Sequence, residues 1–166
     1  MVLIPDRVHV SRSLEKRIKR QEYTLSFDQA FNEVIHNCSS VEREGQQGTW
    51  IGGEMIAAYQ QLFKLGYAHS VEAWYEGELV GGLYGIAIGR VFFGESMFSL
   101  RSDASKVAFV HLARQLDHWG FPLIDCQVTN PHLISLGAEE IDRDHFLGII
   151  EQHIDQAGPG NWSCQD

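Results

Sequence analysis

One stretch of the sequence constrains the fold more than any other: residues 69–98, HSVEAWYEGELVGGLYGIAIGRVFFGESMF. β-Branched and aromatic residues are frequent in it, and two turn signals divide it, Glu76-Gly77 and Gly89-Arg90. This pattern is typical of strands joined by tight hairpins, and strands joined in this way run antiparallel. The sequence therefore predicts a three-stranded meander, with strands over 69–75, 78–88 and 91–98.

Helical periodicity flanks the meander on both sides. Helices are predicted within residues 9–20, 23–40, 54–66, 103–119, 130–138 and 142–156, and a further strand over 121–128. Ser26 or Asp28 is the expected cap of the second helix. The Gly81-Gly82 pair inside a strand predicts a bulge or a close backbone approach. The order of elements predicts the α+β class, with a mostly antiparallel sheet flanked by helices. It is compatible with an N-acetyltransferase-like (GNAT-type) domain.

Length and composition indicate a water-soluble chain with one ordinary core. The chain has 166 residues, of which 44% are hydrophobic and 21% are charged. No apolar run approaches the roughly 18–20 residues that span a bilayer, and the first ten residues lack the pattern of a signal peptide. The three cysteines, Cys38, Cys126 and Cys164, are odd in number and far apart. They predict free thiols in a reducing cytoplasm.

Charge is distributed unevenly along the chain. The formal net charge is −9, yet the first twenty residues hold six of the 13 Lys and Arg residues and two of the 22 Asp and Glu residues. The basic residues of this segment are Arg7, Arg12, Lys16, Arg17, Lys19 and Arg20. A basic segment on an acidic body is typical of a local contact with a polyanion, and a solvated helix face is the alternative.

Two polar side chains stand together in the strand predicted over 121–128. Strand alternation places Asp125 and Gln127 on one face, about 6.5–7 Å apart. Polar side chains in an otherwise apolar strand need hydrogen-bond partners or a ligand. The pair is therefore either a structural contact to loop backbone or part of a functional site.

Glu95 is a single carboxylate in the apolar run RVFFGESMFS. Alternation predicts that Phe93 and Met97 flank it on its own face, where an unpaired carboxylate costs several kcal/mol. Two readings follow. Glu95 is either a buried acid satisfied by Trp50 or Tyr59, or a ligand-facing acid at the mouth of an apolar pocket.

Several common catalytic signatures do not occur in the sequence. There is no GxSxG, no Walker loop, no HExxH and no Cys nucleophile with local His partners. His111 and His118 are seven residues apart but match no metal-ligand spacing. The loop that leads into the predicted long helix, LRSDAS at 100–105, contains no glycine, whereas a coenzyme A acetyltransferase needs a Gly-rich loop for pyrophosphate at the start of a helix. No metal and no cofactor are predicted.

Short motifs spread over about residues 2–147 resemble one known family. They are HVSRSL, GTWI, AYxxLxxLGxAHSVExW, LVGGLYG, GESMFS followed by ASK, LIDCQ, and HLxSLGA. GESMFS and LIDCQ at this separation are the most specific. This combination resembles the leucyl/phenylalanyl-tRNA–protein transferases. The resemblance implies a GNAT-like fold and a bacterial cytoplasmic enzyme that needs no cofactor. Members of that family also carry a further N-terminal domain, upstream of the region where this sequence begins.

The resemblance implies transfer of leucine, phenylalanine or methionine from aminoacyl-tRNA to proteins that begin with Arg or Lys. This transfer marks the acceptors for degradation through the N-end rule. By the same resemblance, Gln127 contacts the attacking amine through its amide oxygen and Asp125 orients and polarises it. Glu95 joins them as the third catalytic residue, hydrogen-bonding the incoming group at the pocket.

Substrate-binding residues are also implied by the resemblance. Trp50 stacks on or beside the terminal adenine, with Tyr59 nearby. The apolar pocket walls are Leu83, Phe92, Met97, Phe109, Leu112 and Ile124. Each of these positions can instead be plain core. The basic residues Arg12, Lys16, Arg17, Lys19 and Arg20 match a cluster that contacts the phosphates of the tRNA acceptor stem.

The predicted organisation has three parts: a basic segment over 1–20, an aminoacyltransferase domain over 21–156 and a tail over 157–166. The expected partners are aminoacyl-tRNA and acceptor proteins, without a membrane, and the expected state is a monomer. Two alternatives remain open at this point. One is a protein that binds the tRNA acceptor end without catalysis, and the other is a coenzyme A–dependent N-acetyltransferase.

Overall fold

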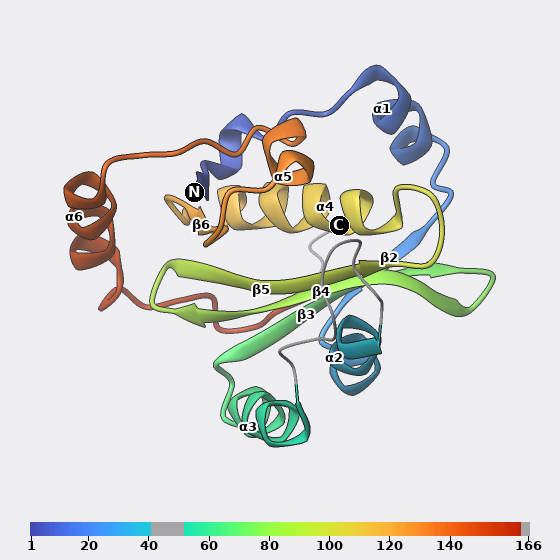
Figure 1. Cartoon of the computed structure of the whole chain (residues 1–166), viewed down its shortest axis with the longest axis horizontal. Coiled ribbons are helices and arrows are strands. Elements are labelled where there is room, and N and C mark those ends of the chain that lie inside the picture. Colours follow the sequence, from blue (N-terminus) through green and yellow to red (C-terminus); the bar gives the residue numbers. More distant parts are fainter. Residues whose placement is uncertain (41–51, 164–166) are drawn as a thin grey trace.

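A single six-stranded sheet forms the centre of the computed structural model, which describes residues 1–40 and 52–163 (Figure 1). The strands are β1 (Val2–Leu3), β2 (Thr24–Phe27), β3 (Ala68–Tyr75), β4 (Glu78–Ile88), β5 (Val91–Ser99) and β6 (Ile124–Asp125). Their order across the sheet is β1-β6-β5-β4-β3-β2. Within the described residues every neighbouring pair is antiparallel except β5 and β6, which are parallel. The predicted meander is confirmed as β3, β4 and β5.

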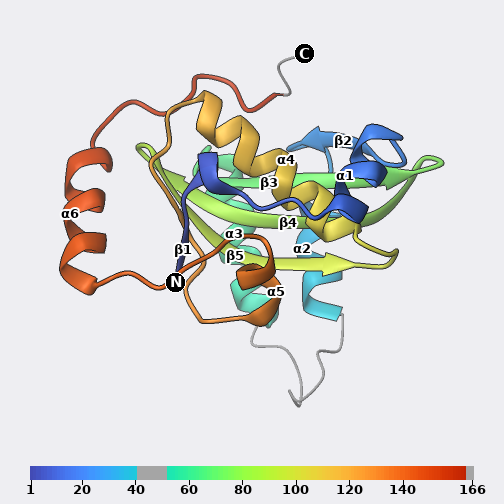
Figure 2. The same cartoon turned by 90° about the horizontal axis from the view of Figure 1, so that it is seen from above.

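Helices cover the sheet. They are α1 (Arg12–Lys19), α2 (Phe31–Ser40), α3 (Gly53–Lys64), α4 (Ala104–His118), α5 (Pro131–Ser135) and α6 (Arg143–His153), with a 3-10 turn η1 (Pro5–Arg7). Figure 1 shows α4 on one side of the sheet and α2 and α3 on the other. In Figure 2, α4 crosses the strands diagonally. The chain is thus a mixed α/β structure with one sheet between helices. None of the described helices is long and apolar enough to cross a membrane.

The sheet separates two main apolar clusters. The cluster on the α4 side contains Leu83, Phe92, Phe109, Leu112, Leu116 and Ile124. The cluster on the side of α2 and α3 contains Phe31, Val34, Tyr59, Tyr84 and Phe98. A smaller third cluster joins α6 to β1 and β5 through residues such as Phe146 and Val91. The apolar residues of the helices and strands therefore pack on both faces of one sheet.

A close approach at Gly81 brings α4 onto β4. A Cβ atom on Gly81 would lie 2.5 Å from the Cβ of Ala104, the first residue of α4. A Cβ on Gly82 would lie 2.6 Å from the carbonyl oxygen of Val71. The close backbone approach predicted from the Gly81-Gly82 pair is confirmed at both positions.

Two strands were not predicted, and the expected cap of the second helix is wrong. Residues 24–27 form β2, which pairs with β3, and residues 2–3 form β1. Ser26 lies in β2, and its hydroxyl donates to Glu72 and accepts from the indole N–H of Trp74. Asp28 accepts the backbone N–H of Ser70. These partners are distant in sequence, so local periodicity could not indicate them.

Glu72 of β3 is fully buried and holds α2 on the sheet. Its carboxylate accepts the hydroxyls of Ser26 and Ser70, each at 2.5 Å, and the backbone N–H of Ala30 at 3.4 Å. Ala30 immediately precedes α2, so the carboxylate stands at the N-terminus of the helix, where the dipole favours negative charge. Burial raises the pKa of Glu72, although these hydrogen bonds oppose the shift.

The raised pKa of Glu72 gives a testable pH dependence. A raised pKa in the folded state means that folding favours the protonated carboxyl. The stabilising contribution of the Glu72 carboxyl is complete at pH values below its usual pKa of 4.5. It is lost as the pH rises through the folded-state pKa. A Glu72→Gln variant cannot ionise. We therefore expect its free energy of unfolding to rise relative to wild type, by about 1.4 kcal/mol per unit of pKa shift, as the pH increases through this window.

Urea unfolding at a series of pH values measures this difference. Glu78→Gln at the exposed start of β4 is the matched control, and it should show no such trend. A difference between wild type and Glu72→Gln that stays constant or falls with pH would contradict the raised pKa.

Candidate active site between strands 5 and 6

The pairing of β5 with β6 is short, and the strands part beside the predicted catalytic residues. The parallel register joins Phe92 to Ile124 and Phe93 to Asp125, and it ends there. β5 continues to Ser99, still paired with β4 on its other side. The two strands therefore diverge, and residues 94–99 of β5 border a notch. We use "notch" for this divergence between β5 and β6.

A β-bulge lies at the start of the notch. Tyr84 of β4 pairs with Ser96 and Gly85 pairs with Gly94, so Glu95 is the extra residue of β5. A bulge re-aims a side chain and reverses the alternation beyond it. Phe92 before the bulge and Met97 after it accordingly both lie on the α4 side.

The predicted surroundings of Glu95 are corrected by this bulge. Phe93 packs in the cluster under α6 and Met97 packs in the cluster under α4, so they do not flank Glu95 on one face. Glu95 instead reaches the hydroxyl of Tyr59 on α3. Burial raises the pKa of Tyr59, and the hydrogen bond to Glu95 and its charge add to this shift. Tyr59 is therefore the phenol that donates to the carboxylate.

Asp125 and Gln127 meet through a turn and not through strand alternation. β6 covers only Ile124–Asp125, and Gln127 has a left-handed backbone with φ of 60°. The backbone N–H of Gln127 donates to Oδ1 of Asp125 at 2.8 Å. The predicted proximity of the pair is confirmed. The strand predicted over 121–128 is confirmed only at Ile124–Asp125, because the chain turns after Asp125.

The side chain of Gln127 ties this turn to the bulge. Its Nε2 donates to the carbonyl oxygen of Gly94 at 3.0 Å. With the nitrogen end bound to Gly94, the oxygen end of the amide is the acceptor that remains for another donor. Asp125, Gln127 and the bulge that carries Glu95 therefore converge at the base of the notch. A cavity of about 380 Å³ opens beside Asp125 and Gln127 on the side of β1 and α6, with Val2, Arg143 and Phe146 on its walls.

The six predicted pocket walls lie together on the α4 side of the sheet. They are Leu83, Phe92, Met97, Phe109, Leu112 and Ile124, and they form part of one apolar cluster. Tyr59 belongs to the opposite face. Trp50 lies outside the described residues. Phe92, Met97 and Ile124 belong to the two strands that border the notch.

Neither a cysteine nucleophile nor a metal centre is found among the described residues. Burial raises the pKa of Cys126 to about 12, with a further contribution from the charge of Asp125, so the reactive thiolate form is disfavoured. No group of three or more His, Cys, Asp or Glu side chains in residues 1–40 and 52–163 can hold a metal ion.

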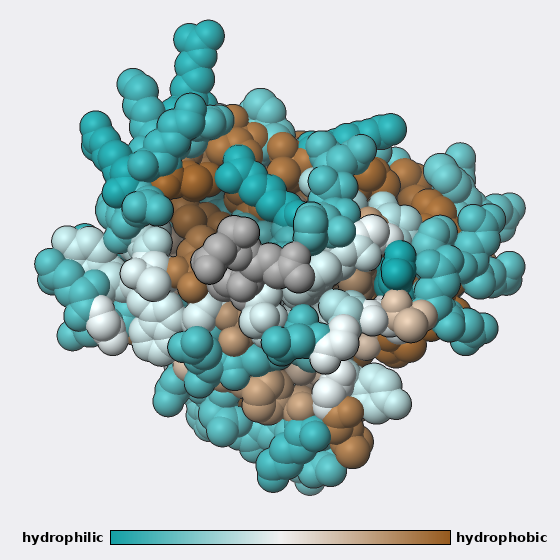
Figure 3. All heavy atoms as spheres, turned by 180° about the vertical axis from the view of Figure 1, so that it is seen from behind, coloured by the Kyte–Doolittle hydropathy of each residue, from teal (hydrophilic) through white to brown (hydrophobic). Residues whose placement is uncertain are grey.

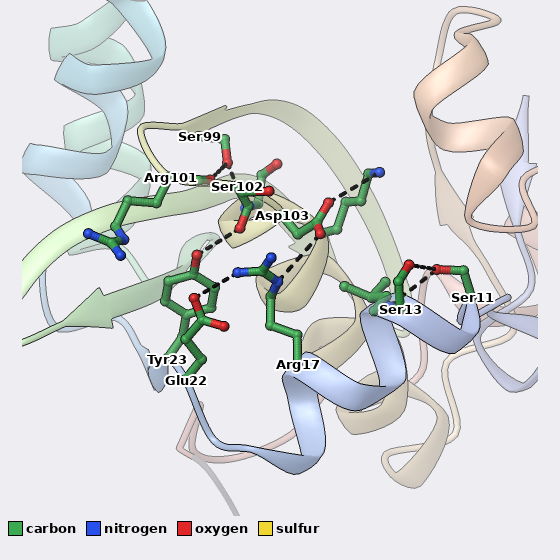
Figure 4. Close-up of polar contacts among 12 residues, drawn as sticks. Ser11, Ser13, Arg17, Glu22, Tyr23, Ser99, Arg101, Ser102 and Asp103 are labelled. Atoms are coloured by element: carbon green, nitrogen blue, oxygen red, sulfur yellow. Dashed lines mark hydrogen bonds and ion pairs between the residues drawn. The ribbon is translucent and has the colours of Figure 1, made fainter.

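An acidic residue occupies the start of α4. Asp103 precedes the helix with a left-handed backbone, φ 61°, and its carboxylate lies 3.5 Å from Arg17 and 3.4 Å from Lys106 (Figure 4). A helix N-terminus ordinarily attracts phosphate. Here the Asp103 carboxylate makes no capping hydrogen bond to the helix and pairs instead with two cationic side chains.

The basic residues of α1 divide into two groups. Arg17 points inward and bonds Glu22 at 2.7 Å as well as Asp103 (Figure 4). Arg17 therefore docks α1 on the domain. Four other basic residues are exposed: Arg12, Lys16, Lys19 and Arg20. Their spacing puts them on one side of the helix. We call these four residues the basic face, and Figure 3 shows long hydrophilic side chains projecting from the α1 corner.

One long-range contact was missed by sequence reasoning, namely that of the segment after α6. Residues 157–163 form no helix or strand, as the predicted tail suggests, but Trp162 packs against the core cluster on the α4 side. A lone tryptophan in a polar, glycine-rich segment is the one signal that could have indicated this contact.

Comparison with a solved structure supports the fold. The structure of L-PGS from Bacillus licheniformis matches with a TM-score of 0.50 at 14% sequence identity. The match covers 90% of this chain and 50% of that one. At this identity the similarity concerns the fold alone.

Comparison with curated proteins identifies the family. A model of the leucyl/phenylalanyl-tRNA protein transferases matches residues 2–151. Proteins named leucyl/phenylalanyl-tRNA–protein transferase from Aromatoleum aromaticum, Nitrosomonas europaea and Thiobacillus denitrificans are 55%, 60% and 54% identical to this chain. The matches cover 99%, 92% and 98% of this chain, and 70%, 64% and 72% of the relatives. The chain spans about two thirds of their length, and it belongs to the leucyl/phenylalanyl-tRNA protein transferase family of aminoacyltransferases.

Proposed function

We propose that this chain transfers leucine or phenylalanine from aminoacyl-tRNA to the α-amine of an acceptor protein. The observation that carries this proposal is the hydrogen bond from Gln127 to the carbonyl oxygen of Gly94. It fixes the amide so that its oxygen is the acceptor at the base of the notch, beside Asp125 and Glu95. Membership of the family supports the reaction class, and the notch is where we place the reaction.

The reaction is the aminolysis of an ester. A bond forms between the amine nitrogen and the aminoacyl carbonyl carbon, and the bond from that carbon to the 3′-terminal ribose oxygen breaks. The attacking amine loses a proton and the leaving ribose oxygen gains one. The amide oxygen of Gln127 accepts an N–H of the amine, and Asp125 orients Gln127 through its backbone N–H. A neutral amide is a poor base, so positioning supplies much of the rate.

The aminoacyl side chain enters the apolar cluster between the sheet and α4. Met97 and Ile124 stand on the two diverging strands, and both belong to that cluster. Leu83, Phe92, Phe109 and Leu112 complete the walls. Glu95, held by Tyr59 on the other face, hydrogen-bonds the incoming group at the entrance. Adenine stacking on Trp50 is part of the same proposal.

The basic face of α1 contacts the phosphates of the tRNA acceptor stem. Four exposed cations on one side of a helix suit a sequence-independent contact with a phosphate backbone. Arg17 has a different role from the one inferred from the sequence, since its guanidinium is engaged by Glu22 and Asp103. It positions the helix that carries the basic face.

The net charge and the family membership support a choice of acceptor proteins and of aminoacyl groups. The acceptors are proteins that begin with Arg or Lys, which a body with a net charge of −9 attracts. Methionine is a third aminoacyl group. The product is marked for degradation through the N-end rule in the cytoplasm. The protein acts as a monomer, with a GNAT-like arrangement in which aminoacyl-tRNA takes the place of acetyl-coenzyme A.

Transfer of radiolabelled leucine from leucyl-tRNA to a protein that begins with Arg tests the proposal directly. We expect label at the α-amine, and none on a matched acceptor whose α-amine is acetylated. Tight tRNA binding without transfer would favour a protein that only binds the acceptor end. Acetyl transfer from acetyl-coenzyme A would favour an N-acetyltransferase, against which the lack of glycine in the loop before α4 weighs.

Substitution of the catalytic pair should separate chemistry from binding. Asp125→Ala removes the carboxylate that holds the backbone of Gln127. We expect the transfer rate to fall at least about 100-fold, because the amide oxygen is no longer positioned. The affinity for tRNA should stay within about three-fold, because phosphate contacts dominate that affinity. Single-turnover transfer and filter binding measure the two quantities.

Asp117→Ala, at an exposed position of α4, is the matched control for the loss of one carboxylate. It should leave both quantities unchanged. An Asp125→Ala variant that transfers at the wild-type rate would remove Asp125 from the mechanism.

Substitution of the basic face should change the salt dependence of tRNA binding. Lys16→Ala together with Arg20→Ala removes two exposed cations from α1. We expect weaker binding, and a slope of log affinity against log salt that is flatter by about two. Lys64→Ala, exposed at the end of α3, is the control and should leave the slope unaltered. An unaltered slope in the double variant would make the basic face a solvated surface.

A further inference from the structure

The segment after α6 lies across the turn between β4 and β5 and is hydrogen-bonded to it. The backbone N–H of Arg90 donates to the carbonyl oxygen of His153 at 3.0 Å, and its side-chain Nε donates to that of Ala157 at 3.1 Å. Gly89 has φ of 58°, and a Cβ there would lie 2.1 Å from the carbonyl oxygen of Ile154. We call residues 154–163 the strap. The strap therefore lies in contact with the turn.

The strap ends in an aromatic box. The ring of Trp162 stacks on His69 with centroids 3.8 Å apart and an interplanar angle of 8°. Its other ring neighbours are Trp119 at 5.0 Å, Phe92 at 5.9 Å, Phe27 at 6.1 Å and Phe121 at 6.3 Å. His69 is held at both nitrogens, by Asp28 at 2.8 Å and by the carbonyl oxygen of Gly66 at 3.2 Å. Trp162 thus packs on a fixed platform.

Phe92 connects this box to the aminoacyl pocket. It is 1% exposed and shares the α4-side cluster with the other pocket walls. A Cβ on Gly85 would lie 2.5 Å from Cζ of Phe92, so the ring rests directly on β4. Trp162 stands beside the same ring. Figure 2 shows the path of the strap back past the C-terminal end of α4. The Phe92 ring therefore lies next to both β4 and the strap.

We propose that Trp162 is a specificity-determining residue: it holds Phe92 in place and thereby limits the depth of the aminoacyl pocket. This inference rests on the proposed transfer function and deepens it. The side chain of Trp162 acts through Phe92, so it is a positioning residue. Without the indole, the Phe92 ring can retreat toward the box, and the pocket then accepts a larger side chain more readily.

The test compares leucine with phenylalanine in the full chain. We expect Trp162→Ala to shift the ratio of kcat/KM for phenylalanyl-tRNA over leucyl-tRNA toward phenylalanine by about ten-fold, the discrimination that a methylene-sized change gives in an apolar pocket. Trp162→Phe keeps a ring in the box and should restore most of the wild-type ratio. Trp74→Ala removes an indole at the far end of β3 from His69 and should leave the ratio within about two-fold.

A binding measurement separates this inference from the function on which it rests. Adenosine carrying leucine or phenylalanine through a 3′-amide cannot be turned over, and titration calorimetry gives the affinity of each compound. The same shift toward phenylalanine is expected in Trp162→Ala. An unchanged ratio in a folded Trp162→Ala variant, with wild type active, would overturn the role of Trp162 alone. A wild-type chain that neither transfers nor binds either aminoacyl group would overturn both proposals.

Discussion

The short parallel contact between β5 and β6 is the constraint on which the site depends. Two residue pairs hold the strands together, and the bulge at Glu95 and the turn after Asp125 then drive them apart. The hydrogen bond from Gln127 to Gly94 closes the base of the notch. Had β6 continued along β5, the ladder would have consumed the backbone groups of residues 94–99 and closed the space between the strands. The polar site and the apolar pocket meet because this pairing stops early.

The rest of the molecule supports that divergence from both faces. On one face, the approach of Ala104 to Gly81 seats α4 over the meander, so that its apolar stripe stands beside the notch. On the other face, Tyr59 of α3 holds Glu95. The buried carboxylate of Glu72 binds the N-terminus of α2 to β3 through hydroxyl and backbone donors. These contacts join residues that are far apart in the sequence, and they hold the elements that surround the candidate site. The strap and Trp162 add further long-range contacts beside Phe92, a wall of the proposed aminoacyl pocket.

The charged residues at α1 have two different environments. Five cations of α1 looked equivalent in the sequence, yet Arg17 faces Glu22 and Asp103 while the basic face points outward. Asp103, which immediately precedes α4, in turn pairs with Arg17 and Lys106. A chain with a net charge of −9 thus presents a local positive surface.

Local pattern was sufficient for the meander, the long helix and the class of fold, because alternation, helical periodicity and turn residues act within a few positions of each other. The motifs around Glu95 and Asp125 were sufficient for the family. Tertiary structure alone decided the rest. The bulge reverses the faces of β5, β2 and β1 exist only through pairing with distant strands, and Arg17 and Trp162 take their roles from partners far away in sequence. Contacts between distant residues are formed when the chain folds, and neither propensity nor spacing along the sequence carries that information.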